Sequence, residues 1–149
     1  MVYTVSEMVK RLGISPSALR YYDQEGLLPF VERSEGGVRL FREEDIEWLQ
    51  IIFCLKKTGM RLKDIRAFVL LALEGDATVE ARLDLIVRQK EAVTAEIATL
   101  AEVLHILEFK EWYYETAREC GGTQVPRDMP TEALPPRFRE IRKKLRGGV

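Results

Sequence analysis

Apolar and polar positions at the start of the chain alternate with the period of a short amphipathic helix. Apolar residues stand at positions 5, 8, 9 and 12, which is the spacing of one helical face. Thr4 and Glu7 match a capping box at the beginning of this stripe, and Gly13 suits a left-handed residue at its end. The pattern therefore predicts a first helix that stops at Gly13.

A second short helix is predicted immediately after this stop. Ser15 is a favourable N-cap, Pro16 fits the first helical position, where its missing N–H does no harm, and Gly26 ends the segment. The outward face of this helix carries a cation and hydroxyl groups, on Ser17, Arg20 and Tyr21. Helix, tight turn and short helix together form a helix-turn-helix pattern.

A β-hairpin is predicted next, with Gly36 and Gly37 as its two-residue turn and with Arg33 and Arg39 on either side. Strands this short are not stable alone, so the hairpin must lean on a helical core. Two more helices are predicted at residues 43–58 and 62–74, each followed by a glycine. Their predicted inward residues are Ile46, Leu49, Phe53, Leu62, Ile65, Val69 and Ala72.

A much longer helix is predicted from Thr78 to about Glu119, a span without glycine or proline. Within it, positions 83, 86, 90, 93, 97, 100, 104 and 107 alternate by three and four, and seven of these eight are apolar. This heptad spacing is typical of a coiled coil. A single helix would leave the stripe in water, so the pattern also predicts a partner.

The chain changes character after Cys120. Residues 121–136 are rich in proline and glycine and are predicted to form a linker. Residues 137–146 are short and basic, and we interpret them as a solvated helix or a disordered end. An additional contact to DNA or to a partner is the alternative for this tail.

Composition restricts the class of protein. The 149 residues suit one domain with appendages, and 46% apolar with 32% charged residues favour a core over a membrane protein. Two cysteines and one histidine exclude a multi-disulfide framework, a four-ligand cysteine or histidine zinc site and an iron–sulfur site within one chain. We expect a cytoplasmic protein with no leader, no transmembrane helix, no cofactor and no metal.

Charge is unevenly distributed although the net charge is −1. Residues 1–75 carry eleven basic and eleven acidic side chains, residues 76–120 five and ten, and residues 121–149 seven and three. The acidic middle segment can therefore offset a basic surface elsewhere in the net charge.

The predicted elements suit contact with DNA. A short helix with an exposed Arg20 can enter the major groove, and arginines on a hairpin can reach phosphates or the minor groove. This favours a winged DNA-binding module. Periodicity alone leaves open the alternative of an ordinary helical domain in which Arg20 and Tyr21 are simply solvated.

Several sequence blocks occur at a specific spacing. They are Tyr3–Glu7, Leu19–Asp23, Gly26–Pro29, Arg33, Gly36-Gly37, Arg39, Phe41 and Thr58–Met60. With these blocks, about residues 1–118 resemble the MerR family of bacterial transcription regulators. The resemblance implies a mainly α fold: a winged helix-turn-helix domain over residues 1–75, a long antiparallel coiled-coil dimerisation helix over residues 76–120, and a linker with a basic tail over residues 121–149.

The resemblance also implies a function. A homodimer would bind a pseudo-palindromic promoter operator in double-stranded DNA, bend and untwist it, and so act on RNA polymerase indirectly through the DNA. Carried over by position, the DNA contacts would come from Ser15, Ser17, Ala18, Arg20, Tyr21 and Tyr22 in the recognition helix and from Arg33, Arg39 and Phe41 in the wing. This chain departs from many members at Val38 and Leu40, where those members have aromatic residues.

Two features are candidate sensors of a signal. A subgroup of the family associated with aldehydes and other electrophiles has a cysteine in its third helix, and the segment around Cys54 resembles it. The alternative is a buried cysteine that packs as a small apolar side chain. The aromatic cluster of Phe109, Trp112, Tyr113 and Tyr114 could hold a flat, lipophilic cationic ligand, or it could pack against the partner's DNA-binding domain.

Two rival functions remain open on the sequence. One is a coiled-coil adaptor that binds protein, and the other is an accessory factor that bends DNA without regulating a promoter. An enzyme is not expected, because the sequence has no nucleophile–base pair, no glycine-rich phosphate loop and no metal cluster. No motif in the sequence identifies the inducer, the operator, or whether the protein activates or represses.

Overall fold

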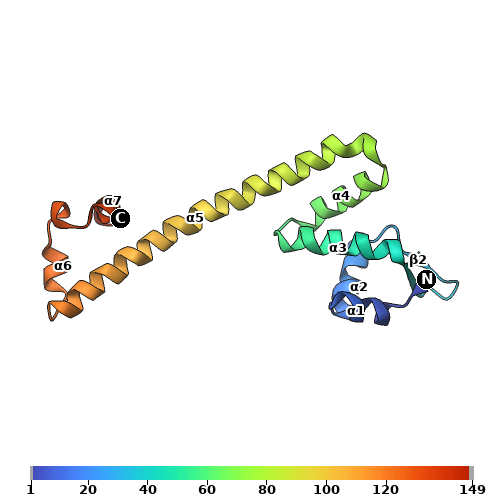
Figure 1. Ribbon diagram of the computed structural model, residues 1–149, viewed down its shortest axis with the longest axis horizontal. Helices are drawn as coiled ribbons and strands as arrows, with labels where there is room; N and C mark the ends of the chain where they lie inside the picture. The colour runs from blue at the N-terminus through green and yellow to red at the C-terminus, as the bar shows by residue number, and fades with distance from the viewer. Residues whose placement is uncertain (1, 148–149) are drawn as a thin grey trace. The chain divides into compact units, whose positions relative to one another are not determined.

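The computed structural model describes residues 2–147. These residues are mainly helical (Figure 1). They form two compact units that divide between Val93 and Thr94. The elements in chain order are β1 (Val2–Tyr3), α1 (Val5–Leu12), α2 (Pro16–Gln24), β2 (Glu32–Arg33), β3 (Arg39–Arg42), α3 (Glu43–Lys57), α4 (Leu62–Leu73), a 3₁₀ turn (Asp76–Thr78), α5 (Val79–Glu119), α6 (Gln124–Asp128), a second 3₁₀ turn (Thr131–Ala133) and α7 (Pro136–Gly147).

The first two helices begin and end where local chemistry places them. The Thr4 amide donates to Glu7 Oε2 at 2.7 Å and the Glu7 amide donates to Thr4 Oγ1 at 3.4 Å, which is the predicted capping box. The Thr4 amide also holds the pKa of Glu7 below its ordinary value, because it stabilises the carboxylate. Gly13 ends α1 at φ 66°, and the Ser15 hydroxyl caps α2 by accepting from the Ala18 amide at 3.1 Å.

The sheet has three strands in the order β1-β3-β2, all antiparallel. Strand β1 is absent from the sequence prediction and adds Tyr3 opposite Phe41. The predicted two-residue turn is wrong. The Ser34 amide donates to the Val38 carbonyl at 2.8 Å and the Gly37 amide to the Ser34 carbonyl at 2.8 Å, so the loop has three residues and ends on Gly37 at φ 77°. A type I turn followed by a left-handed glycine is a common three-residue hairpin connection.

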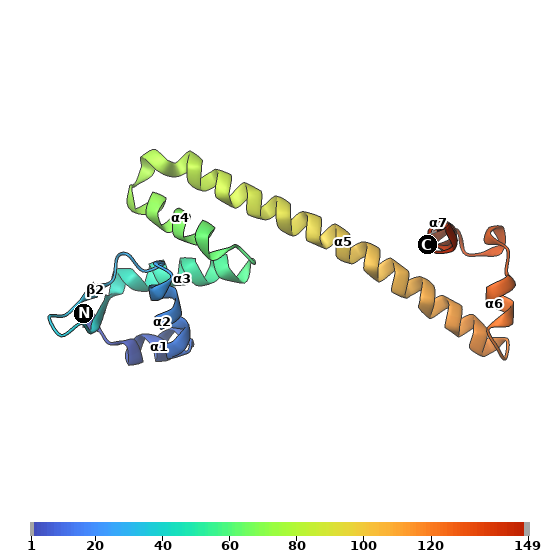
Figure 2. The same cartoon turned by 180° about the vertical axis from the view of Figure 1, so that it is seen from behind.

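The core of the first unit lies where α1, α2, α3, α4 and the hairpin meet. α4 lies along α3 in both ribbon views (Figures 1 and 2). The predicted inward residues Leu49, Ile65 and Val69 are fully buried. Ile52 and Leu55 are also buried and are not among the predicted inward residues. The beginning of α5 joins this unit, because the Gln89 side chain donates to the Thr58 carbonyl at 2.8 Å.

The C-terminal segment differs from the prediction of a linker and a solvated basic tail. Leu134, Phe138 and Ile141 are buried against Phe109 of α5 and form the core of the second unit. The nearly buried Arg142 donates to the carbonyl oxygens of residues 126, 127 and 129 at 2.9, 2.6 and 3.2 Å. The tail is therefore a packed element, because its few apolar residues fall on one helical face while most of its basic residues point outward.

Candidate nucleic-acid interface

Helix α2 presents its predicted contact residues with different degrees of exposure. Arg20 is exposed and makes no ion pair or side-chain hydrogen bond within residues 2–147. Tyr21 is 46% exposed, and Ser17 is exposed with its hydroxyl 3.0 Å from that of Ser15. An unpaired guanidinium beside hydroxyl groups on a short helix can reach both base edges and phosphates in a major groove.

Three other predicted residues have a part in the fold as well. Ser15 uses its hydroxyl as the helix cap, so its contact with a ligand would be an additional one. Ala18 is half-buried. Tyr22 packs its ring 5.4 Å from that of Phe53 in α3 and is also half-buried.

The wing arginines are held by Asp23, which is not among the predicted contact residues. Arg33 Nη2 lies 2.7 Å from Asp23 Oδ2, and Arg39 Nε lies 2.8 Å from the same oxygen, with Arg39 Nη2 also bonded to it. Asp23 comes from the end of α2, so one carboxylate joins the recognition helix to both strands of the wing. The only sequence signal for it is the acidic residue that closes the Leu19–Asp23 block.

Phe41 corrects the predicted set of DNA contacts. Its side chain is completely buried in the core of the first unit, where β3 packs on the helices. It is therefore inaccessible to DNA in this fold. The physical reason is strand alternation: Arg39 and Phe41 both lie on the side of β3 that faces the helices, and only the long arginine reaches the rim of that face.

Ion pairs around the sheet hold its edges in place. Glu43 accepts a hydrogen bond from Tyr3 Oη at 2.5 Å and from Arg11 Nη2 at 2.5 Å, which joins β1 and α1 to α3. These donors lower the pKa of Glu43, the Tyr3 hydroxyl contributing most. Arg42 Nη2 lies 2.7 Å from Glu32 Oε1 across β3 and β2. All of these groups except Tyr3 are exposed, so each pair stabilises the fold only modestly.

Cys54 is exposed on α3, which contradicts the alternative of a buried cysteine. Burial falls instead on Ile52 and Leu55, the positions on either side of Cys54 and Phe53. Cys120 is exposed as well. Within residues 2–147 no three cysteine, histidine or acidic side chains come together as a metal site.

The aromatic cluster on α5 is filled by the chain itself. The Phe138 ring of α7 lies 5.7 Å from the rings of both Phe109 and Trp112, and Phe109 is buried. Tyr113 donates its hydroxyl to the Thr123 carbonyl at 3.3 Å, whereas Tyr114 is exposed. Phe109 and Trp112 thus pack on α7 of the same chain, and not on the partner's DNA-binding domain as one expected alternative had it.

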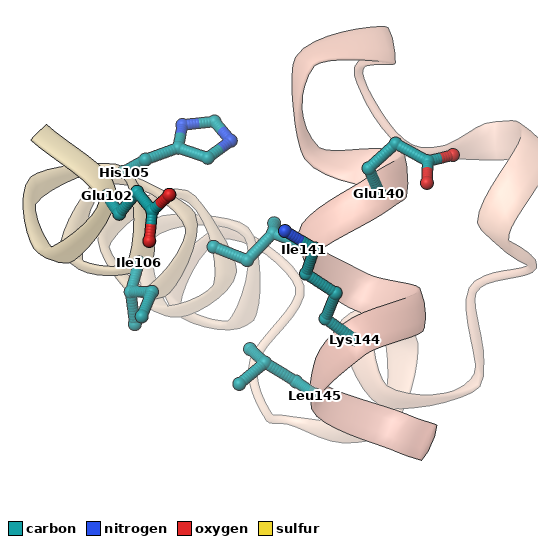
Figure 3. Close-up of a pocket in the computed structure, with 7 residues that line it drawn as sticks. All are labelled: Glu102, His105, Ile106, Glu140, Ile141, Lys144 and Leu145. Atoms are coloured by element: carbon teal, nitrogen blue, oxygen red, sulfur yellow. The ribbon is translucent and has the colours of Figure 1, made fainter. Parts of the chain in front are cut away.

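A small groove of about 190 Å³ remains between α5 and α7 (Figure 3). The side chains of the two helices face each other across it, and the Glu140 carboxylate points away from α5. Its floor is apolar, because Ile106, Ile141 and Leu145 form it. The other lining residues are Glu102, His105, Glu140 and Lys144.

Among residues 2–147 no helix is both long enough and apolar enough to cross a membrane.

Comparison with known proteins places this geometry in a family. The model of the MerR HTH family regulatory protein matches residues 3–70. An HTH-type transcriptional regulator of Haemophilus influenzae is 44% identical over 125 residues, which cover 84% of this chain and 93% of that protein.

Two crystal structures agree with this match. One is HiNmlR, a MerR family regulator lacking the sensor domain, bound to promoter DNA; it has a TM-score of 0.66 at 42% identity and covers 87% of this chain and 98% of its own. The other is a MerR family regulator from Bacillus thuringiensis with a TM-score of 0.61 at 38% identity, covering 74% of this chain and 96% of its own. These relatives are transcriptional regulators and not enzymes. The chain accordingly belongs to the MerR family of helix-turn-helix transcriptional regulators.

Proposed function

We propose that two copies of this chain join through α5 and together bind a pseudo-palindromic operator within a promoter. In this proposal α2 of each copy enters the major groove and the wing contacts the flanking backbone. The pair bends and untwists the duplex and thereby controls access of RNA polymerase to it. The observation that carries the proposal is the long apolar stripe that α5 leaves in water.

The stripe is exposed along most of its length. Six of its apolar residues are between 39% and 62% exposed in the single chain: Leu83, Ile86, Ile97, Leu100, Leu104 and Leu107. Such a surface is far more apolar than a monomer ordinarily presents to water. The heptad spacing suits the stripe of another helix, and a second copy supplies one of matching length.

The packing of α7 supports a second copy on this face. Successive residues of a helix are rotated by about 100°, so Phe109 lies roughly opposite Leu100 and Leu104. The chain therefore covers one side of α5 with its own α7 and leaves the other side open. A two-fold pair formed there presents two copies of α2, and two equal readers favour an operator with two related half-sites.

Binding to promoter DNA is supported by the relative HiNmlR, which is bound to promoter DNA in its crystal structure. The free guanidinium of Arg20 and the arginines of the wing give this chain a local basic surface in spite of its net charge of −1. Bending a site of this size costs on the order of 1–6 kcal/mol, which phosphate contacts from two copies can offset.

The experiment compares two lysine substitutions on opposite faces of α5. Leu100→Lys places a charge in the stripe, whereas Ala98→Lys places the same charge about 200° away around the helix. Sedimentation analysis should give a pair of chains for wild type and Ala98→Lys and a single chain for Leu100→Lys. Duplex binding should fall with the loss of pairing. Pairing that persists in Leu100→Lys, or is lost equally in both variants, would remove α5 as the interface.

The exposure of Cys54 favours a second proposal, that its thiol reacts with carbonyl electrophiles and changes the promoter response. A thiol in water can add to an aldehyde carbon to give a hemithioacetal, whereas a buried one cannot meet the reagent. Mass spectrometry after treatment with formaldehyde should find the adduct on the Cys54 peptide in preference to that of Cys120, which is also exposed. Unaltered induction in a Cys54→Ser strain would exclude the proposal.

A further inference from the structure

Asp23 stands out because it is a negative charge on the element that is expected to meet DNA. Its side chain is only 12% exposed, and it accepts from Arg33, which is 51% exposed, and from Arg39, which is 20% exposed. Both arginines reach the same carboxylate oxygen, Oδ2. One carboxylate thus pairs with two guanidinium groups, so the cluster of Asp23, Arg33 and Arg39 keeps a net positive charge toward the solvent.

The two arginines are also neighbours within the wing. Arg33 on β2 is the register partner of Arg39 on β3, and the next pair, Ser34 and Val38, closes the hairpin loop. A carboxylate that bonds to both therefore holds the two strands at the base of the loop. Strands of two and four residues have little stability of their own, so contacts with the helical core decide where the wing points.

We propose that Asp23 is a positioning residue for DNA binding: it ties Arg33 and Arg39 to the end of α2 and fixes the wing relative to the recognition helix. A guanidinium has five N–H donors, and Arg33 uses only Nη2 for Asp23. Its remaining donors make no other hydrogen bond within residues 2–147, so they can meet a phosphate in an orientation that Asp23 sets. This inference rests on the proposed roles of α2 and the wing as the DNA-contacting elements.

The inference makes a prediction opposite in sign to simple electrostatics. Removal of a carboxylate from a DNA-facing surface ordinarily strengthens binding, because one repulsive charge near the phosphates is lost. If Asp23 positions the wing, its removal weakens binding to a specific site, because two arginines lose their orientation. Binding to an arbitrary duplex, which depends on charge more than on geometry, does not weaken.

The test uses the full chain and two probes. The first is a duplex of about 30 base pairs that the wild-type protein selects from a random pool, and the second is a shuffled duplex of the same composition. The variants are Asp23→Asn, which removes the charge, and Asp23→Glu, which keeps a carboxylate. Glu25→Gln is the matched control, because Glu25 is exposed, lies next to α2 and makes no ion pair within residues 2–147.

Asp23→Asn should bind the selected duplex on the order of tenfold more weakly, the loss expected when hydrogen bonds to a charged group are removed. Its affinity for the shuffled duplex should stay equal or rise. Asp23→Glu should recover part of the loss, and Glu25→Gln should keep or slightly raise both affinities. Asp23→Asn that binds the selected duplex as tightly as Glu25→Gln would overturn the inference, and so would an equal loss on both probes, which indicates damage to the fold.

Hydrogen exchange without DNA gives a second readout. The amides of Ser34 and Val38, which are hydrogen-bonded across the hairpin loop, should exchange faster in Asp23→Asn than in wild type, and unchanged exchange would overturn the inference. A wild-type protein that selects no duplex would contradict the proposed function itself. That failure is distinguishable from failure of the Asp23 inference, which appears only as a difference between variants.

Discussion

Single charged side chains hold together parts of this chain that are distant in sequence, as Asp23 does for α2 and the wing and Glu43 does for α1 and α3. The Thr4–Glu7 capping box is predictable because helical geometry fixes which neighbours meet. Asp23 bonds to residues ten and sixteen positions away, and no local rule brings such groups together. The exposure of Arg20 could be predicted from helical spacing, whereas the burial of Phe41 depends on how β3 packs.

Arg142 provides a prediction at this scale. Its guanidinium satisfies carbonyl oxygens around the end of α6 and is nearly buried, and burial lowers its pKa. Arg142→Met would leave the carbonyls of Pro126 and Met129 without this donor, whereas the Arg127 carbonyl would still accept from Arg146 Nη2 at 2.8 Å. The loss should cost about 1–3 kcal/mol. Urea unfolding followed by Trp112 fluorescence in a Trp48→Phe background should show a lower midpoint. The exposed Lys144→Met is the control, and an equal effect of both substitutions would contradict this role.

Glu43 predicts a dependence of stability on pH. The Tyr3 hydroxyl, and then Arg11, lower its pKa in the folded chain. A lowered carboxylate pKa contributes stability above the ordinary glutamate range, and this contribution disappears as the pH falls through the folded value. The melting temperature should therefore fall less between about pH 6 and pH 3.5 in Glu43→Gln than in wild type. The melting temperature of a Glu47→Gln variant on the same helix should depend on pH as that of wild type does. The same pH dependence of the melting temperature in Glu43→Gln and wild type would contradict this role of Glu43.

At the scale of elements, sequence patterns locate most of the helices. The stops at Gly13 and Gly26 and the span of α5 follow from caps, glycines and the absence of helix breakers. The short pieces are less predictable. Strand β1 has two residues and is a strand only because β3 lies beside it, and the hairpin loop is longer than the pair of glycines suggested.

The hairpin loop predicts a difference between its two glycines. Gly37 has φ 77°, and a Cβ there would meet nothing within 4 Å, so the cost of Gly37→Ala comes from the backbone alone, about 1–2 kcal/mol. Gly36 does not have a positive φ and also has space, so Gly36→Ala should be nearly neutral. Thermal unfolding of the two variants compares them directly. Equal melting temperatures would mean that the loop does not need a left-handed residue at position 37.

At the scale of the whole molecule, the sequence indicates that α5 needs a partner, and the exposed stripe agrees. The same sequence did not indicate that α7 covers another side of α5. Contacts such as that between Phe109 and Phe138 join residues separated by two turns and a short helix, so composition alone makes the segment resemble a linker. The family assignment depends on specific sequence blocks, because a helix-turn-helix pattern by itself is common.

The central claim is that a pair of these chains binds one duplex. Native mass spectrometry of the full chain with the selected duplex of about 30 base pairs measures the composition of the complex directly. The account predicts two chains on each duplex, with no complex of one chain at equilibrium. A complex with a single chain, or no complex with any double-stranded probe at low ionic strength, would contradict it.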